Sequence, residues 1–166
     1  MAARSPFLER YVWHVDGVVL DITKMKRAAA LLSGRHNFEW MSLAQEGELR
    51  NPVRELHLSI ELVDPGPFAT ANTNGPQNLI KITGQCDFFL YRMMRRIVGI
   101  LVNIATGRID EMSLKTCLAE NDGAGLGGKG APMRQRNSSD IPATLLQTAP
   151  AKGLCLEHIE YQAPIW

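Results

Sequence analysis

The chain has 166 residues, 45% of them hydrophobic, which is enough to build one globular domain with a core and excludes a chain disordered by composition. Eighteen Lys and Arg residues stand against 17 Asp and Glu residues, a formal net charge of +1. This balance excludes a strong overall basic field as an argument for nucleic-acid binding, so any such role has to rest on local patches.

The cysteines and the apolar stretches indicate the cellular compartment of the protein. Cys86, Cys117 and Cys155 have no C-x-x-C spacing, and their apolar surroundings are typical of buried free thiols in a reducing compartment. The longest apolar stretch is interrupted by Arg92, Arg95 and Arg96, and residues 1–6 lack a signal-peptide apolar region. We therefore expect an intracellular protein with no membrane partner, without assigning it to cytoplasm, nucleus or organelle.

The first half of the chain predicts two strands and a helix. Residues 11–15 have strand character, although the chain leads into them without an earlier element, as if a preceding portion were missing. Asp21 is placed to cap a helix with apolar residues at helical spacing, and Gly34 is placed to stop it, with residues 34–38 as a turn. Residues 53–63 alternate apolar and polar side chains, which predicts a half-buried strand.

The second half continues with two helices and two strands. A turn-rich loop at about 64–78 precedes a strand from residue 79 to 83. A long buried helix starts near residue 89 and runs to Gly107, and a shorter helix covers 111–120. A Gly-rich tract within a loop insertion at about 121–147 follows, and residues 154–161 predict a closing strand with a bulge.

This order of elements predicts an α+β fold in which an antiparallel sheet carries its helices on one face. We expect residues 1–166 to form a single domain, and the apparent loss of an earlier portion suggests that it is half of a larger unit.

The helix that starts near residue 89 is the most informative segment, because it holds three arginines among side chains apolar enough for a core. At about 100° per residue, one stripe is formed by Phe89, Met93, Ile97, Ile100 and Ile104. Arg92, Arg96 and Asn103 share a narrow polar strip. Arg95 lies at its edge, where its guanidinium is partly desolvated and requires a carboxylate or phosphate partner.

Three other patterns carry no chemistry in our interpretation. Residues 123–129 have a G-x-x-x-x-G-K skeleton, but no Ser or Thr follows and Pro132 spoils the helix that a phosphate loop needs, so we interpret them as a flexible loop. Gly107 and Asp110 are interpreted as a helix stop and the next N-cap. The four histidines, His14, His36, His57 and His158, lack metal-ligand spacing, so no metal is expected.

Four blocks in the sequence occur in the order of a known family. They are Leu32–Phe38 (L-S-G-R-H-N-F), Asn51–Arg54 (N-P-V-R), Phe89–Gly99 (F-L-Y-R-M-M-R-R-I-V-G) and Ala149–Leu154 (A-P-A-K-G-L). Together they resemble the C-terminal half of TruA-type tRNA pseudouridine synthases. The resemblance covers about residues 5 to 161, and the loops at about 64–78 and 121–147 depart from the family pattern.

The resemblance implies isomerisation of uridine to pseudouridine in the anticodon stem region of tRNA, with no cofactor and no metal. The family nucleophile is an aspartate in an R-T-D motif of the N-terminal half, and these 166 residues contain no such motif. The chain alone is therefore expected to be inactive. Arg95 matches the family arginine that pairs with this aspartate, while Phe89, Met93 and Leu154 are expected to shape the substrate pocket; ordinary core packing is the alternative for these three.

For contact with tRNA, the partner that the resemblance implies, the candidate residues are Arg50, Arg54, Arg92 and Arg96. Their alternative is a solvated polar face. Pairing of two copies, as in bacterial relatives, is a further expectation. A different function also remains open at this point, namely a non-catalytic RNA-binding module that uses the same surface without chemistry.

Overall fold

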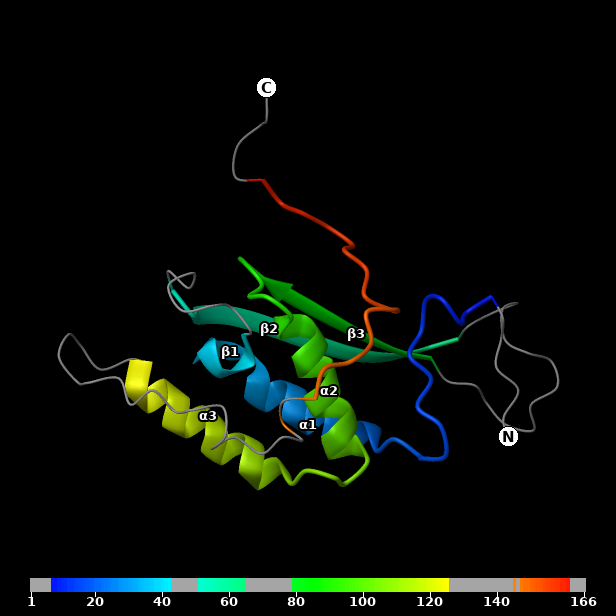
Figure 1. The fold of residues 1–166 in the computed structure, drawn as a ribbon, viewed down its shortest axis with the longest axis horizontal. Helices are drawn as coiled ribbons and strands as arrows, with labels where there is room; N and C mark the ends of the chain where they lie inside the picture. The colour runs from blue at the N-terminus through cyan, green and yellow to red at the C-terminus, as the bar shows by residue number, and fades with distance from the viewer. Residues whose placement is uncertain (1–6, 43–50, 65–78, 126–144, 146, 162–166) are drawn as a thin grey trace.

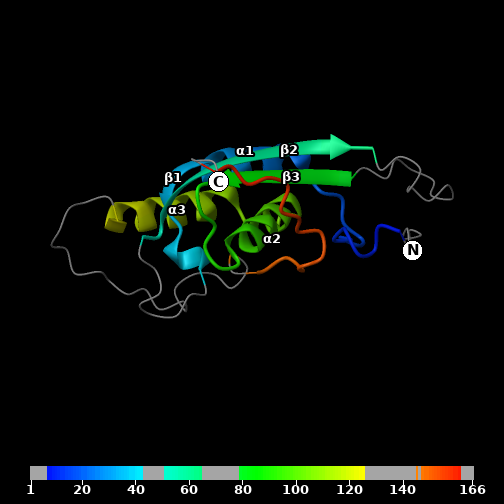
Figure 2. The same cartoon turned by 90° about the horizontal axis from the view of Figure 1, so that it is seen from above.

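The computed structural model describes residues 7–42, 51–64, 79–125, 145 and 147–161 (Figure 1). Within these residues it has three α-helices, one short 3-10 helix and a three-stranded antiparallel sheet in the order β1-β2-β3. The helices gather on one side of the sheet, and Figure 2 shows α1 lying under β2, against which it packs. The predicted α+β class with helices on one face is confirmed.

Helix α1 (Ile22–Leu32) forms where the sequence predicts it. The Asp21 carboxylate accepts a hydrogen bond from the backbone N–H of Lys24 at 3.0 Å and so caps the first turn. The helix buries one stripe against the core, formed by Met25, Ala28, Ala29 and Leu32. It ends at Ser33, and Gly34 follows with φ +117°, a backbone conformation that side chains disfavour.

The sheet is built around the long strand β2 (Val53–Val63), as its alternating pattern predicts. Leu56 and Ile60 are buried on the helix side, whereas Glu55, His57, Ser59 and Glu61 face solvent. β3 (Leu79–Cys86) pairs with β2 from Val63↔Leu79 to Leu56↔Cys86 and extends three residues beyond the expected strand.

One strand was missed by the sequence analysis. Residues 34–38 were expected to be a turn, but β1 (Gly34–Asn37) pairs antiparallel with the start of β2. The short 3-10 helix η1 (Glu39–Met41) follows it and buries Trp40 and Met41. A four-residue strand of Gly, Arg, His and Asn has no apolar side chain and so no periodic signal, and only its pairing with β2 reveals it.

Helix α2 (Met93–Ala105) is the centre of the core, with ten of its 13 residues buried. It begins four residues later than expected because Arg92, in a left-handed conformation at φ +62°, breaks the helical path. Its last residue is Ala105, two residues before the predicted stop at Gly107, whose φ is +73°. Helix α3 (Glu111–Gly125) takes in residues 121–125, which were expected to belong to a loop.

Two expected strands are absent from the described residues. Residues 11–15 are turn and irregular backbone, and residues 154–161 are extended but have no strand partner. Of the predicted loops, residues 65–78 and most of 126–147 lie outside the described residues, as does the Gly-rich tract beyond Gly125. In the part of the chain that is described, no helix is both long and apolar enough to cross a membrane.

The three cysteines are free thiols but differ in exposure. Cys117 is buried in the core, as expected, whereas Cys86 is half-buried and Cys155 is exposed. The expected burial of all three is therefore wrong for Cys155, because the segment that carries it does not join the sheet.

Candidate functional site

The four sequence blocks, far apart along the chain, are brought together by the fold: the first contacts the second, the second contacts the residue before the third, and the third contacts the fourth. The first and second blocks meet where β1 pairs with β2, with His36 opposite Arg54 and the N–H of Phe38 donating to the carbonyl of Pro52 at 3.1 Å. The start of β2 also pairs with the end of β3, which places it beside the beginning of the β3–α2 connection.

Arg54 of the second block contacts Phe88, the residue immediately before the third block. Its Nε donates to the carbonyl oxygen of Phe88 at 2.9 Å, and its guanidinium carbon lies 5.6 Å from the centre of the Phe88 ring. Nη1 of the same side chain donates to the carbonyl of Val53 at 2.9 Å. Arg54 therefore has two nitrogens committed to backbone carbonyls, which holds it in place at the rim of the fold.

The third and fourth blocks are joined at Arg95 and Ala149. The Arg95 Nε donates to the Ala149 carbonyl at 2.8 Å, and the N–H of Ala149 donates to the Arg95 carbonyl at 3.0 Å. Further along α2, the Asn103 amide donates to Oε1 of Gln147 at 2.7 Å. Gly99 lets this segment approach, since a Cβ there would overlap with the Gln147 carbonyl oxygen.

Arg95 is half-buried, and the predicted partial desolvation is the part of its expected environment that the structure shows. Its side chain is half-buried and oriented by the bond to Ala149. Within the described residues, its two terminal nitrogens make no hydrogen bond or ion pair with a carboxylate. The two terminal nitrogens of a guanidinium held in this way can donate a pair of hydrogen bonds to a carboxylate or phosphate.

Arg96 is placed differently from the expectation. It is only 5% exposed, and its Nη1 donates to the carbonyls of Trp40 and Ser42 at 3.2 and 3.3 Å. Burial, and secondarily the charge of Arg92, lowers the pKa of Arg96 from its ordinary value. Asn103 is buried as well, so Arg92 is the one member of the predicted polar strip that faces solvent. Arg96 anchors η1 to α2 and is not placed to touch RNA.

The predicted pocket residues lie in different environments. Met93 is fully buried in the core, whereas Phe89 is 36% and Leu154 56% exposed. Leu154 is presented by a turn in which its N–H donates to the Ala151 carbonyl at 3.2 Å, with Gly153 at φ +89° in the position that requires a left-handed residue. Met93 has no access to a surface, and its interpretation as core is the one that its burial favours.

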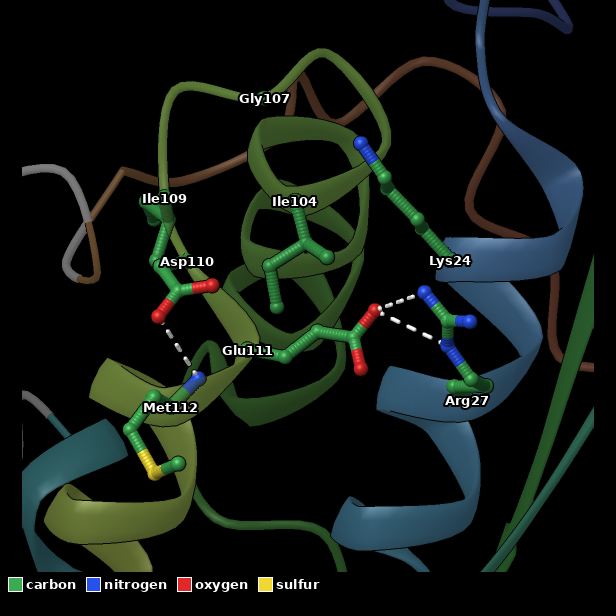
Figure 3. Close-up of a pocket in the computed structure, with 8 residues that line it drawn as sticks. All are labelled: Lys24, Arg27, Ile104, Gly107, Ile109, Asp110, Glu111 and Met112. Atoms are coloured by element: carbon green, nitrogen blue, oxygen red, sulfur yellow. Dashed lines mark hydrogen bonds and ion pairs between the residues drawn. The ribbon is translucent and has the colours of Figure 1, made fainter.

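A hollow of about 450 Å³ lies elsewhere, between α1, the end of α2 and the start of α3 (Figure 3). Among its charged groups, Arg27 donates to Glu111 at 2.7 Å, and Asp110 accepts from the backbone N–H of Met112 at 3.3 Å. Asp110 therefore caps α3, as predicted. Because Ala105 is ten residues from Arg95, the hollow is about 15 Å further along α2 and forms no part of the Arg95 site.

Sequence reasoning missed two contacts. His36, interpreted as a turn residue, bonds through Nδ1 to the Asp122 carboxylate at 2.7 Å, and the N–H of Asn37 donates to the same carboxylate at 2.8 Å. The exposed rings of Phe88 and Tyr91 were also missed. The signal available for these rings was the presence of aromatic residues immediately beside Asp87 and Arg92 in a helix-start segment.

Comparison with known proteins gives a consistent result. A family model described as tRNA pseudouridine synthase matches residues 28–138. The chain is 34% identical over 155 residues to tRNA pseudouridine synthase A of Moorella thermoacetica, which covers 93% of this chain and 50% of the relative. It is 35% identical over 158 residues to that of Syntrophotalea carbinolica, covering 95% and 50%. The chain thus spans about half the length of these curated relatives, and the resemblance drawn from the four blocks is confirmed.

Proposed function

The chain belongs to the tRNA pseudouridine synthase family, and from that membership we propose that it forms the C-terminal half of an enzyme that isomerises uridine to pseudouridine in tRNA. The observation that carries the proposal is Arg95. It is half-buried, held by Ala149 of another family block, and has its terminal nitrogens unpartnered by any described residue.

The reaction requires a flipped uridine to be held while its glycosidic bond breaks, the base turns, and a carbon of the base is joined to the sugar. The nucleophile of the family is an aspartate in an R-T-D motif, and this chain has none. Arg95 would hold that aspartate ionised and oriented, since an adjacent guanidinium favours the charged form of a carboxyl group. In this proposal the chain alone is inactive and supplies one part of the site.

The exposed apolar side chains of residues 154–161 are consistent with contact to a second half of the enzyme. Leu154, Leu156, Ile159 and Tyr161 are between 52% and 73% exposed. Apolar groups gathered in one exposed segment are typical of a contact surface. We assign this segment to contact with the half of the relatives that the present chain does not span.

The substrate is proposed to be the anticodon stem region of tRNA, with phosphate contacts from arginines at the rim. Arg54 and Arg92 remain candidates, because Arg54 of β2 contacts the β3–α2 connection at Phe88 and Arg92 is an exposed residue of that connection. Arg96 is withdrawn because of its burial, and Arg50 lies outside the described residues. Pairing of two copies of the chain stays a prediction, which sedimentation velocity would test.

The test is release of tritium from C5-labelled uridine in tRNA. The chain is assayed alone and together with a complementary N-terminal half that carries R-T-D. We expect activity only in the combination, and a fall of about 10²-fold or more on Arg95→Ala, because one preorganised charged group typically contributes that much. Arg108→Ala is the matched control, since Arg108 is an exposed arginine near the opposite end of α2.

Two results would contradict the proposal. Activity of the unaltered chain alone would show that the nucleophile lies within these 166 residues. No activity in the combination, with tRNA binding retained, would leave the non-catalytic RNA-binding module and reduce Arg95 to a structural role.

A further inference from the structure

The connection between β3 and α2 carries two exposed aromatic rings, each with an arginine beside it. Phe88 is 65% and Tyr91 60% exposed. The guanidinium of Arg54 lies 5.6 Å from the centre of the Phe88 ring, and that of Arg92 lies 5.2 Å from the centre of the Tyr91 ring. We call these four residues the aromatic–arginine patch.

The patch is held by backbone hydrogen bonds and a buried anchor. The Asp87 carboxylate accepts from the N–H of Phe88 at 2.9 Å, and Arg54 donates to the Phe88 carbonyl. The N–H of Met93 donates to the carbonyl of Leu90 at 2.9 Å, closing a turn around Tyr91 and Arg92. Leu90 itself is only 5% exposed. The connection therefore buries Leu90 and turns the rings on either side of it outward.

Arg92 adopts a conformation that an arginine rarely takes. It is the only non-glycine residue of the described chain with a positive φ, and although it stands at the N-cap of α2 its side chain caps nothing. A glycine or asparagine would fit this backbone better. The guanidinium is placed instead over the Tyr91 ring, at the surface. An unfavourable conformation retained at an exposed position points to a role in function.

We propose that the aromatic–arginine patch binds unpaired bases of RNA, with Phe88 and Tyr91 stacking on bases and Arg54 and Arg92 reaching the adjacent phosphates. Exposed rings interleaved with guanidiniums match a single strand, which presents flat bases and anionic phosphates in alternation. The connection itself holds one arginine, Arg92, and one acidic residue, Asp87, and Arg54 of β2 brings a second guanidinium to the patch. The inference rests on the proposed function in taking that RNA to be tRNA.

The patch would thus hold an unpaired strand next to Arg95. Residues 92 and 95 are three positions apart at the start of α2, so the patch and the Arg95 guanidinium lie within one helical turn of each other. A base drawn out of its stack needs its neighbours held, and stacking platforms do so without sequence preference.

The test is fluorescence anisotropy of the full chain with three labelled probes. These are a 12-nucleotide oligouridine, the same oligonucleotide with abasic sites, and a 12-base-pair RNA duplex. The variant Phe88→Leu/Tyr91→Leu keeps the apolar surface and removes the rings. Tyr11→Leu is the control, because Tyr11 is 72% exposed and lies in the N-terminal segment.

We expect the double leucine variant to bind the oligouridine about tenfold or more weakly, with duplex binding unchanged. The abasic probe should bind the unaltered chain as weakly as the oligouridine binds the variant. Arg92→Asn should instead reduce the steepness of the salt dependence for both single-stranded probes, because it removes a phosphate contact.

The proposal is overturned if the unaltered chain does not bind the oligouridine, or if the leucine variant binds it as well as the unaltered chain does. It is also overturned if that variant changes only the sedimentation of the protein, since the patch would then contact a protein. None of these results affects tritium release by the combined halves, so failure of the patch and failure of the synthase are distinguishable.

Discussion

Helix α2 and residues 154–161 are both rich in apolar side chains and have opposite environments. In α2, Ile97, Ile100 and Leu101 are fully buried, packed against α1 and crossed by the segment around Gln147. In the C-terminal segment, Leu156 is 73% and Ile159 52% exposed. Its described ties to the sheet include the ion pair of Glu157 with Lys81 at 2.8 Å, between two exposed side chains.

The difference teaches what an apolar pattern does and does not specify. A helix satisfies its own backbone hydrogen bonds, so it needs only an apolar neighbour, and α1 and β2 supply one within the chain. A strand needs a partner for its N–H and C=O groups as well as for its side chains. The pattern at 154–161 predicts a strand, but within the described residues the segment forms no backbone pairing with β1, β2 or β3.

The largest expected effect contrasts the two regions directly. Ile100→Ala should lower the free energy of unfolding by about 4 kcal/mol, because it leaves a cavity in the centre of the core. Leu156→Ala should change it by less than about 0.5 kcal/mol, as for an ordinary surface position. Urea denaturation followed by circular dichroism measures both. Equal losses of unfolding free energy for the two variants would contradict the difference in burial between the two regions.

The next effect tests how the fourth block is attached to α2. Gly99→Ala should destabilise the chain by about 2 kcal/mol, because the new methyl group overlaps with the Gln147 carbonyl and forces the backbone apart. Gly123→Ala is the matched control: it also changes a helical glycine, but a Cβ there meets nothing within 4 Å. The control should stabilise α3 by about 0.5 kcal/mol. Thermal unfolding of both variants would show whether the shifts have opposite signs.

A smaller effect concerns α3, which is tied to β1 by polar groups as well as by packing. Asp122→Ala should cost about 1.5 kcal/mol, since His36 and the N–H of Asn37 lose their shared acceptor at a half-buried position. Glu55→Ala provides the comparison, because Glu55 is 68% exposed at its side chain. Hydrogen exchange of the Asn37 amide would report the lost hydrogen bond locally. Unaltered protection of that amide would contradict the proposed stabilisation of β1 by Asp122.

The smallest effect separates stability from binding. Arg92→Asn should raise the free energy of unfolding by up to about 1 kcal/mol, because asparagine tolerates φ +62° and can cap α2. The same change should weaken binding of single-stranded RNA, for which we propose the arginine is retained. Lower stability together with unchanged RNA affinity would show that Arg92 is there for packing.

Several elements could be predicted from local pattern because local forces decide them. The cap at Asp21, the alternation of β2, the stop at Gly107 and the cap at Asp110 were all confirmed. Each depends on residues within one or two turns of chain, so the sequence window contains the cause.

The errors have a common origin in distant partners. β1 exists because β2 pairs with it, and α2 starts late because the connection from β3 turns at Arg92. Arg96 belongs to the polar strip by helical angle, yet η1 folds over it and supplies carbonyls for its guanidinium. A helical projection gives the direction of a side chain and says nothing about what covers it.

By itself, the sequence determined the helix boundaries set by caps, the α+β class and the family, and it predicted an anionic partner for Arg95. Only the tertiary structure decided which arginines are accessible, that Ala149 orients Arg95, and that Phe88 and Tyr91 face outward. The physical reason is the distance along the chain over which each interaction acts. Hydrogen bonding along a helix and alternation along a strand act between near neighbours. Burial and site geometry depend on segments more than 50 residues apart, such as Arg95 and Ala149 at a separation of 54.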